Sequence, residues 1–275
     1  MVVATAARTT FGPVATDMNA LCDDLAAEHQ ALDDIVAPLP APQWDLPTPA
    51  PGWAIRDQVG HLAFFDRAAV LAATDESAFR TEADRMMGGG ADPSVELGRS
   101  VGPPDLLELW RTGRTEMVAL FRTLDPGQRL PWYGPAMSAA SFATARLMET
   151  WAHARDVADA LGVDQPATDR LRHVAHIGVR ARPFSYMTNG LEVPDGDVRV
   201  ELVAPSGGEP WTWGDPDAVD RVTGPALDFC LVATQRRHLA DTALVVEGPL
   251  ATEWMGIAQA FAGPPGEGRS AGQFA

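Results

Sequence analysis

Three side chains in this sequence are of the types that bind a reactive metal ion. Glu149 and His153 lie four positions apart in a segment with helical character, so their side chains project from the same face of one helix. A carboxylate and an imidazole at that spacing can hold one cation together. His61, in a second helical stretch, can supply a third ligand. Two histidines and one carboxylate leave coordination positions open, which is typical of a catalytic rather than a structural metal centre.

Composition and charge indicate a soluble globular protein and exclude several classes of partner. The 275-residue chain is 46% hydrophobic and has a formal charge of −16 at pH 7. Nucleic acids and anionic membranes require a basic surface, so we expect neither as a partner. No apolar run is long enough to span a bilayer, and the N-terminal segment lacks the pattern of a signal peptide. We therefore expect a cytoplasmic protein that acts on a small-molecule substrate.

The cysteine and basic residues restrict the chemistry further. Cys22 and Cys230 are far apart and lie in apolar helical contexts, which is typical of buried free thiols in a reducing compartment. All 21 basic residues are arginine, a bias that indicates a GC-rich genome such as that of an actinobacterium. A chain without lysine forms no Schiff base through a side-chain amine, which excludes typical pyridoxal-phosphate catalysis.

Four long helices are predicted in the first 165 residues. Each carries apolar residues at a spacing of three and four, and prolines, glycines or the N-cap residue Ser138 mark their ends. The segment 76–87 is predicted to be a short helix, and 88–102 a loop that is either a glycine-hinged lid or plain surface. Four long helices and a proline-rich first connection predict a four-helix bundle. The predicted helices are residues 14–38, 54–73, 103–124 and 138–161.

The pattern changes after residue 165. An alternating strand at 198–203 has a predicted hairpin partner at 211–213, and a further strand is expected at 243–247. This order predicts an α+β fold with a small antiparallel sheet. Helices are expected at 168–180, 224–238 and 250–261. The expected organisation is a helix-bundle domain, a smaller α+β domain and a disordered Gly/Pro/Ser-rich tail, at residues 1–165, 166–262 and 263–275.

Spacing alone leaves two interpretations of the polar residues on the predicted helix 138–161. Arg146, Glu149, His153 and Asp156 form a stripe, which can be either a solvated face or an inward-facing site. His61 favours the site, since helix bundles build metal centres from side chains on facing helices. Asp57 and Asp156 are then candidates for the hydrogen-bond partners that orient the two imidazoles.

Two motifs resemble those of the mycothiol-dependent maleylpyruvate isomerase family. They are residues 44–63, with a Pro-rich turn before His61, and residues 149–157. The resemblance implies a DinB-like four-helix bundle and a divalent metal, usually zinc, held by His61, Glu149 and His153. The same ligands would also suit iron or nickel. It further implies mycothiol as a cofactor, whose thiolate adds to an activated double bond and leaves in an isomerase, or stays on the product in an S-transferase.

The second half of the chain is similar, more loosely, to the smaller α+β domain of that family. There a helix ends in an arginine near the metal cleft, and Arg236 matches that position. Thr234 and Gln235 replace the usual Trp-Gly, so the neighbouring Arg237 is an alternative, and both arginines could instead cap the helix C-terminus. Arg236 is the catalytic residue that the resemblance implies, because an arginine there would hold a substrate carboxylate by bidentate hydrogen bonds.

The other histidines have weaker signals. His29 could line the cleft, and His238 is expected to be exposed or to cap a helix. His173 and His176 lie three positions apart, but no acid or cysteine near them completes a site. The sequence has no G-x-S-x-G nucleophile elbow, no P-loop and no dinucleotide-binding fingerprint.

Three functions stay open at this point. The first is a metal-dependent, thiol-using isomerase or S-transferase. The second is a metal enzyme that uses no thiol, such as a hydrolase, lyase or cyclase of specialised metabolism. The third is a metal-binding or ligand-binding protein without turnover. The sequence determines neither the substrate nor the oligomeric state.

Overall fold

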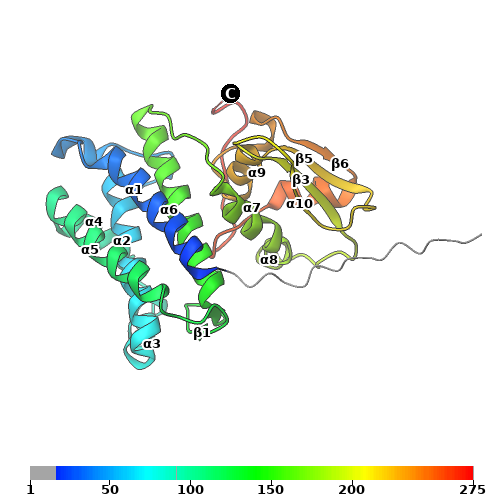
Figure 1. The fold of residues 1–275 in the computed structure, drawn as a ribbon. Helices are drawn as coiled ribbons and strands as arrows, with labels where there is room; N and C mark the ends of the chain where they lie inside the picture. Colours follow the sequence, from blue (N-terminus) through cyan, green and yellow to red (C-terminus); the bar gives the residue numbers. More distant parts are fainter. Residues whose placement is uncertain (1–16, 91, 275) are drawn as a thin grey trace, which may run out of the picture.

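A bundle of long helices and a smaller α+β unit lie side by side (Figure 1). This computed structural model describes residues 17–90 and 92–274, so the predicted helix start near residue 14 lies outside the described part. The predicted four-helix bundle is confirmed. Its helices are α1 (Met18–Val36), α2 (Ile55–Thr74), α5 (Pro103–Phe121) and α6 (Ala139–Leu161).

Local capping explains where these helices begin and end. The side chain of Ser138 accepts a hydrogen bond from the backbone N–H of Ser141 at the start of α6, as its position before the apolar pattern predicts. Gly162 ends α6 in the left-handed conformation, with a φ of 65°. At the start of α2, the Asp57 carboxylate accepts a hydrogen bond of 2.8 Å from the backbone N–H of Ala54. Asp57 therefore stabilises the first turn of the helix that carries His61.

The segment after the short helix α3 (Glu76–Met87) differs from the predicted loop, because residues Pro93–Ser100 form a further helix, α4. Its backbone packs directly on α2. A Cβ atom on Gly60 would lie 2.7 Å from the Cα of Gly98, so both positions require glycine. This helix is a packed structural element rather than a lid, and it places Ser94 against the middle of α2. A short antiparallel hairpin, β1 (Arg129–Leu130) with β2 (Met137–Ser138), precedes α6, and the 3₁₀ helix η1 (Ala41–Asp45) precedes α2.

The second unit holds a four-stranded sheet with strand order β4-β3-β5-β6. The predicted hairpin pair is present, with Val200 opposite Trp213 in antiparallel register. β5 is parallel to β3, so the sheet is mixed rather than antiparallel throughout. The sequence pattern missed β5, whose only strongly apolar residue in the strand centre is Val222. The strands are β3 (Val198–Val203), β4 (Trp211–Trp213), β5 (Asp220–Pro225) and β6 (Val245–Glu247).

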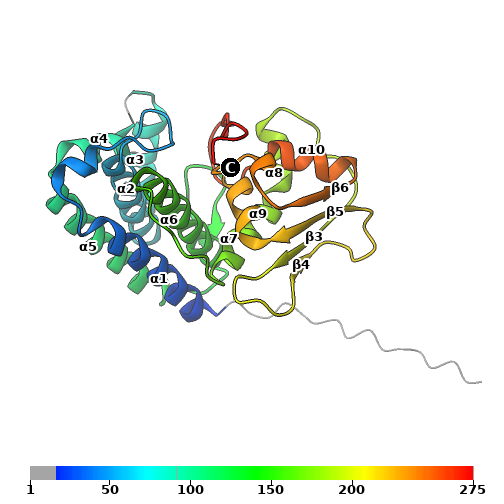
Figure 2. The ribbon, with the colours of Figure 1, turned by 90° about the horizontal axis from the view of Figure 1, so that it is seen from above.

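Short helices connect and cover the strands of this sheet. α7 lies next to α6 of the bundle and α9 packs against α7, as Figure 2 shows. These helices correspond to the three predicted ones, each shorter at one or both ends, and α8 was not predicted. They are α7 (Leu171–Arg180), α8 (Arg182–Thr188), α9 (Ala226–Ala233) and α10 (Pro249–Ile257), with the 3₁₀ helix η2 (Leu239–Asp241).

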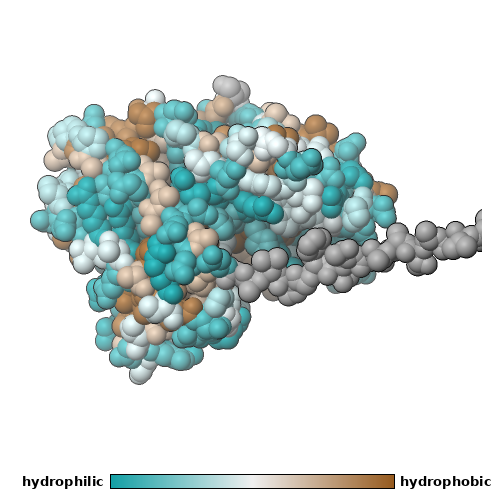
Figure 3. Space-filling model, in the orientation of Figure 1, coloured by the Kyte–Doolittle hydropathy of each residue, from teal (hydrophilic) through white to brown (hydrophobic). Residues whose placement is uncertain are grey.

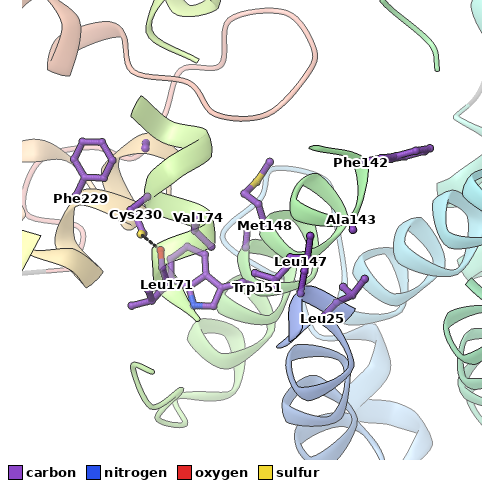
Figure 4. Close-up of a cluster of buried hydrophobic side chains, with 14 of the residues drawn as sticks. Leu25, Phe142, Ala143, Leu147, Met148, Trp151, Leu171, Val174, Phe229 and Cys230 are labelled. Carbon is purple, nitrogen blue, oxygen red and sulfur yellow. Dashed lines mark hydrogen bonds between the residues drawn. The ribbon is translucent and has the colours of Figure 1, made fainter. Parts of the chain in front are cut away.

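One hydrophobic core runs through both units. Trp151 of α6 lies beside Leu171 of α7 and Cys230 of α9 (Figure 4), and the Cys230 thiol donates to the Leu171 carbonyl oxygen at 3.5 Å. Cys22 and Cys230 are both free and buried, as predicted. The expected boundary near residue 165 falls in the connection between α6 and α7. Because the core crosses that boundary, the two units are held in a defined relative position.

The C-terminal segment, expected to be disordered, packs back onto the body of the protein between its two units (Figure 2). Arg269 donates to the Asp156 carboxylate at 2.7 Å, and the backbone N–H of Gly272 donates to Asp241 at 2.7 Å. Glycine and proline predict an irregular backbone, but they do not preclude specific contacts. The buried ion pair of Arg269, the backbone hydrogen bond of Gly272 and the stacking of Arg237 over the Phe274 ring help to hold this segment in place.

The visible surface is mostly hydrophilic, with small scattered hydrophobic patches (Figure 3). This pattern agrees with the acidic composition of the chain. Within residues 17–90 and 92–274, none of the helices combines the length and the apolar character needed to cross a lipid bilayer.

The close contact between α2 and α4 can be tested by substitution. Gly98→Ala should lower the free energy of unfolding by about 1–3 kcal/mol, because the new Cβ would lie 2.6 Å from the Arg56 carbonyl oxygen. Gly113→Ala in α5 is the matched control, since its Cβ meets nothing within 4 Å. The control should raise the free energy of unfolding by about 0.5–1 kcal/mol. Urea unfolding measures both, and equal effects would contradict the contact.

Candidate metal centre and its cleft

The three predicted metal ligands come together between α2 and α6. The Nε2 atom of His153 lies 3.3 Å from an Oε2 of Glu149, and Nε2 of His61 lies 3.9 Å from the same oxygen. One ligand atom from each residue lies within 4.8 Å of the others. The imidazole ring centroids are 4.4 Å apart. This separation allows one cation to contact all three side chains with small rotations of each.

A chain of hydrogen bonds sets the tautomer of His153. Its Nδ1 donates to the Oε1 of Gln58, the Gln58 amide donates to the Thr48 hydroxyl at 2.9 Å, and that hydroxyl donates to the Trp53 carbonyl at 2.9 Å. With its proton on Nδ1, the ring presents the Nε2 lone pair toward Glu149. Metal-binding histidines commonly have such a partner on the second nitrogen.

A serine performs the same role for His61. The His61 Nδ1 lies 3.4 Å from the Ser94 hydroxyl, which donates to the Asp92 carboxylate at 2.7 Å. Ser94 is therefore an acceptor for Nδ1–H, and Nε2 of His61 is free to bind a cation. The sequence did not indicate Ser94, because the helix that carries it was predicted to be a loop.

The partners expected from the sequence for these imidazoles are wrong. Asp57 pairs with Arg99, with hydrogen bonds of 2.9 and 2.8 Å to the two carboxylate oxygens. Asp156 pairs with Arg236 and Arg269. Both acids lie close to a ligand along the helix, but the Nδ1 atoms face residues supplied by other segments. In the sequence, the one hint of these partners was Gln58, a polar residue one turn before His61 on the same helix.

The electrostatic state of the site suits a divalent cation. Burial raises the pKa of the Glu149 carboxyl, but its interactions with His153, His61 and Arg146 outweigh this effect and lower that pKa to about 2. Burial, followed by the charge of His153, lowers the pKa of His61 well below its usual value. Ionised carboxylates and neutral imidazoles are the forms that bind a metal, so the lowered pKa values of Glu149 and His61 fit the divalent metal that the resemblance implies.

Aromatic rings enclose the triad. Trp53, from the Pro-rich turn before α2, stacks on His153 with a centroid distance of 5.8 Å and an interplanar angle of 10°. Phe65, one turn after His61, lies 4.5 Å from the His61 ring. Trp53 is positioned by the bridge between Pro47 and Ala54 that closes the turn. These rings limit access by water to the metal ligands and hold the imidazoles in place.

A cleft of about 1190 Å³ opens beside the triad, and His61 and Glu149 form part of its wall. Residues of both units line it, including α6 on one side and α7 with Trp213 on the other. The buried Tyr133 hydroxyl also faces this region and has no hydrogen-bond partner in the described part of the chain. The open side of the triad therefore faces a space large enough for a small-molecule ligand.

Arg236, the expected catalytic residue, lies just after α9 and is not among the cleft-lining residues in the described structure. Its guanidinium donates to Asp156 at 2.9 Å and to the Thr234 carbonyl at 2.6 Å. The alternative, Arg237, pairs with Asp159. Arg236 still acts on the centre electrostatically, because its positive charge contributes to the lowered pKa of His61. A catalytic role for Arg236 stays a prediction.

The remaining histidines lie outside the triad. His29 is buried, with Nε2 3.7 Å from the Asp66 carboxylate, and it is absent from the described cleft lining. His173 bonds to Asp24 at 2.8 Å, while His176 faces the cleft. His238 is exposed and caps η2, as predicted.

Comparisons with known proteins agree with the fold. The sequence profile described as the mycothiol maleylpyruvate isomerase N-terminal domain matches residues 25–158. This range contains all three triad residues. The chain belongs to the mycothiol-dependent maleylpyruvate isomerase-like family. A second profile, described as wyosine base formation, matches residues 194–247 of the α+β unit.

Relatives in this family extend over nearly the whole chain. Two Mycobacterium tuberculosis proteins, from strains CDC 1551/Oshkosh and H37Rv and both named as uncharacterized, are each 51% identical over 253 residues. The alignments cover 90% of this chain and 96% of each relative. Crystal structures of the mycothiol-dependent maleylpyruvate isomerase and of a mutant of it share the fold, with a TM-score of 0.54 and 16% identity over 81% of this chain and 90% of theirs.

The role of Gln58 generates a prediction about metal affinity. Gln58→Leu should weaken divalent-metal binding by about 10–100-fold, because His153 loses the acceptor that sets its tautomer. Gln30→Leu, on the exposed face of α1, is the matched control and should leave the affinity unchanged. Competition with a chromophoric chelator measures both. Equal affinities in the two variants would show that Gln58 does not orient the ligand.

His29 generates a prediction about pH. Burial is the main cause that lowers the pKa of His29 to about 4. Between pH 6.5 and 4 the unfolded state therefore binds a proton that the folded state excludes, and this group should remove about 3 kcal/mol of stability as the pH falls. His29→Gln should make the decline shallower, whereas the exposed His238→Gln should keep it. Urea unfolding across this range is the measurement, and identical profiles for all three proteins would refute the assignment.

Proposed function

We propose that the protein is a divalent-metal-dependent enzyme that uses a low-molecular-weight thiol, mycothiol, for isomerisation or S-transfer on a small molecule. The observation that carries the proposal is the His61–Glu149–His153 group, of which His61 and Glu149 line a large cleft. A bound divalent metal such as zinc would supply Lewis acidity and lower the pKa of a thiol in that cleft. The family membership and the fold shared with a mycothiol-dependent isomerase support the choice of chemistry.

The residues around the triad have separate tasks in this proposal. Gln58 and Ser94 keep the protons of the two imidazoles on Nδ1. Trp53 and Phe65 exclude water from one side of the site. These four side chains hold the ligand atoms in place before any substrate enters, so little reorganisation is needed during turnover.

Arg236 is the proposed contact for a substrate carboxylate. The guanidinium of Arg236 is held against α6 by Asp156, which lies one turn after His153 on that helix. The Nε–H of Arg236 is buried and has no hydrogen-bond partner among the described residues. A small rotation toward the cleft would let this donor bind a carboxylate oxygen, which is the geometry for which arginine is suited.

The proposal predicts that metal and thiol are both required. His61→Ala and His153→Ala should lower bound metal from about one equivalent to a trace, because two ligands cannot hold the ion tightly. His238→Ala is the matched control, since His238 is exposed and lies outside the triad. Elemental analysis of the purified proteins measures the metal and also identifies it.

The thiol requirement is measured on the metal-loaded protein. Incubation with mycothiol and an electrophilic alkene should give either a mass-detected thiol adduct or the isomerised alkene, and the two triad variants should give neither. Full metal content in His153→Ala would refute the ligand assignment. Metal-dependent conversion of substrate without any thiol would instead favour the hydrolase, lyase or cyclase alternative.

A further inference from the structure

The cleft differs in charge from the rest of the molecule. The chain has 37 acidic and 21 basic residues and a net charge of −16. The cleft lining has the opposite balance: its carboxylate is Glu149, within the part of the chain that the structure describes, and it is accompanied by several cationic or imidazole side chains. These are Arg146, Arg172, Arg180, His61, His173 and His176. An acidic protein that concentrates positive charge in one cleft attracts anions there.

Some of these charges are already neutralised. Arg146 pairs with the buried Asp66 at 2.9 Å, and His173 bonds to Asp24. Arg172 and Arg180, by contrast, have no ion-pair partner within residues 17–90 and 92–274, and both are exposed. Arg172 only lies over the Trp211 ring, 5.8 Å from its centroid. Two uncompensated guanidinium groups therefore remain on the α7 wall of the cleft.

His176 lies between these two arginines on the same face of α7. Arg172, His176 and Arg180 are spaced by four residues, which aligns them along one side of the helix. The Trp213 indole N–H donates to Nδ1 of His176 at 3.3 Å. Nδ1 is thus an acceptor and Nε2 carries the proton. Burial, followed by the charges of Arg180, His173 and Arg172, lowers the pKa of His176, so the ring remains a neutral donor.

We propose that Arg172, His176 and Arg180 form an anion-binding subsite that holds a carboxylate or phosphate group of the ligand whose reactive end lies at the metal triad. The second half of this statement rests on the proposed function, but anion binding by α7 does not. The three donors extend over about 12 Å along the helix. The same cleft of about 1190 Å³ is lined by these residues and by Glu149, so an acid anchored at α7 can extend toward the metal triad within it.

The subsite also accounts for how an acidic chain can bind an acidic ligand. Several buried acidic groups pair with arginines elsewhere, as in the Asp33 pairs with Arg111 and Arg114. The α7 wall keeps its positive charge available. Two charge-assisted donors and a neutral N–H in one row match the several oxygen acceptors of a carboxylate or phosphate.

Calorimetric titration of the metal-free protein tests the subsite directly. The probes are succinate and inorganic phosphate, with succinamide as an uncharged analogue of the first. We expect saturable binding of at least one anion and none of succinamide. The stronger of the two anions identifies whether the subsite prefers a carboxylate or a phosphate.

Single substitutions locate the binding. Arg172→Gln and Arg180→Gln should each lower the affinity for the anion by about tenfold, as expected for loss of one charge-assisted hydrogen bond. Arg67→Gln is the matched control, because it removes one charge from an exposed arginine on α2 that does not line the cleft. His176→Gln keeps an N–H donor and should weaken binding less than His176→Ala. Thermal unfolding followed by circular dichroism verifies that all variants are folded.

Two results would overturn the subsite. One is the absence of saturable binding of both anions to the unmodified protein, and the other is equal weakening by Arg67→Gln and the two α7 variants. Failure of the proposed function is separate from these results. If His153→Ala retains full metal while metal-free protein binds the anion through α7, then the metal-site assignment is wrong and the subsite stands.

Discussion

The burial of α6 on nearly all its sides is the constraint on which the rest of the structure depends. One face carries Glu149 and His153 toward α2, and another places Trp151 against α7 and α9. Asp156, on the last part of the helix, pairs with two arginines from the α+β unit and the C-terminal segment. Because a single rigid helix contributes to the metal centre, the shared core and the inter-unit ion pairs, the cleft between the units has a defined shape.

Each charged side chain buried among these helices needs an oppositely charged or hydrogen-bonding partner. An unpaired buried carboxylate is costly, since desolvation opposes its charged form. Asp66 contacts Arg146 and accepts a hydrogen bond from the Trp110 indole, while Asp33 receives two arginines. Ion pairs of this kind are weak evidence for stability, but they fix the relative positions of helices. Around the metal centre they also leave Glu149 as the carboxylate available for a cation.

The sequence predicted the elements with strong periodicity and the residues within one helix. The four long helices were found because their apolar stripes, caps and proline stops agree with one another. Glu149 and His153 could be paired because residues four positions apart on a helix lie next to each other on the same face. His61 could be joined to them because helix bundles build metal centres from side chains on facing helices, and the family resemblance then supported that choice. α4 and β5 were missed because they are short and their burial comes from neighbours distant in the sequence.

By itself, the sequence determined the helix bundle, the α+β character of the second half and the residue types of a metal centre, since these depend on local spacing and capping. Only the tertiary structure decided which groups orient the imidazoles: Gln58 and Ser94, rather than Asp57 and Asp156. It also decided that the cleft is positively charged in an acidic chain. The physical reason is that hydrogen bonds and local potential depend on distances across elements, and helical periodicity specifies only which face of its own helix a residue occupies.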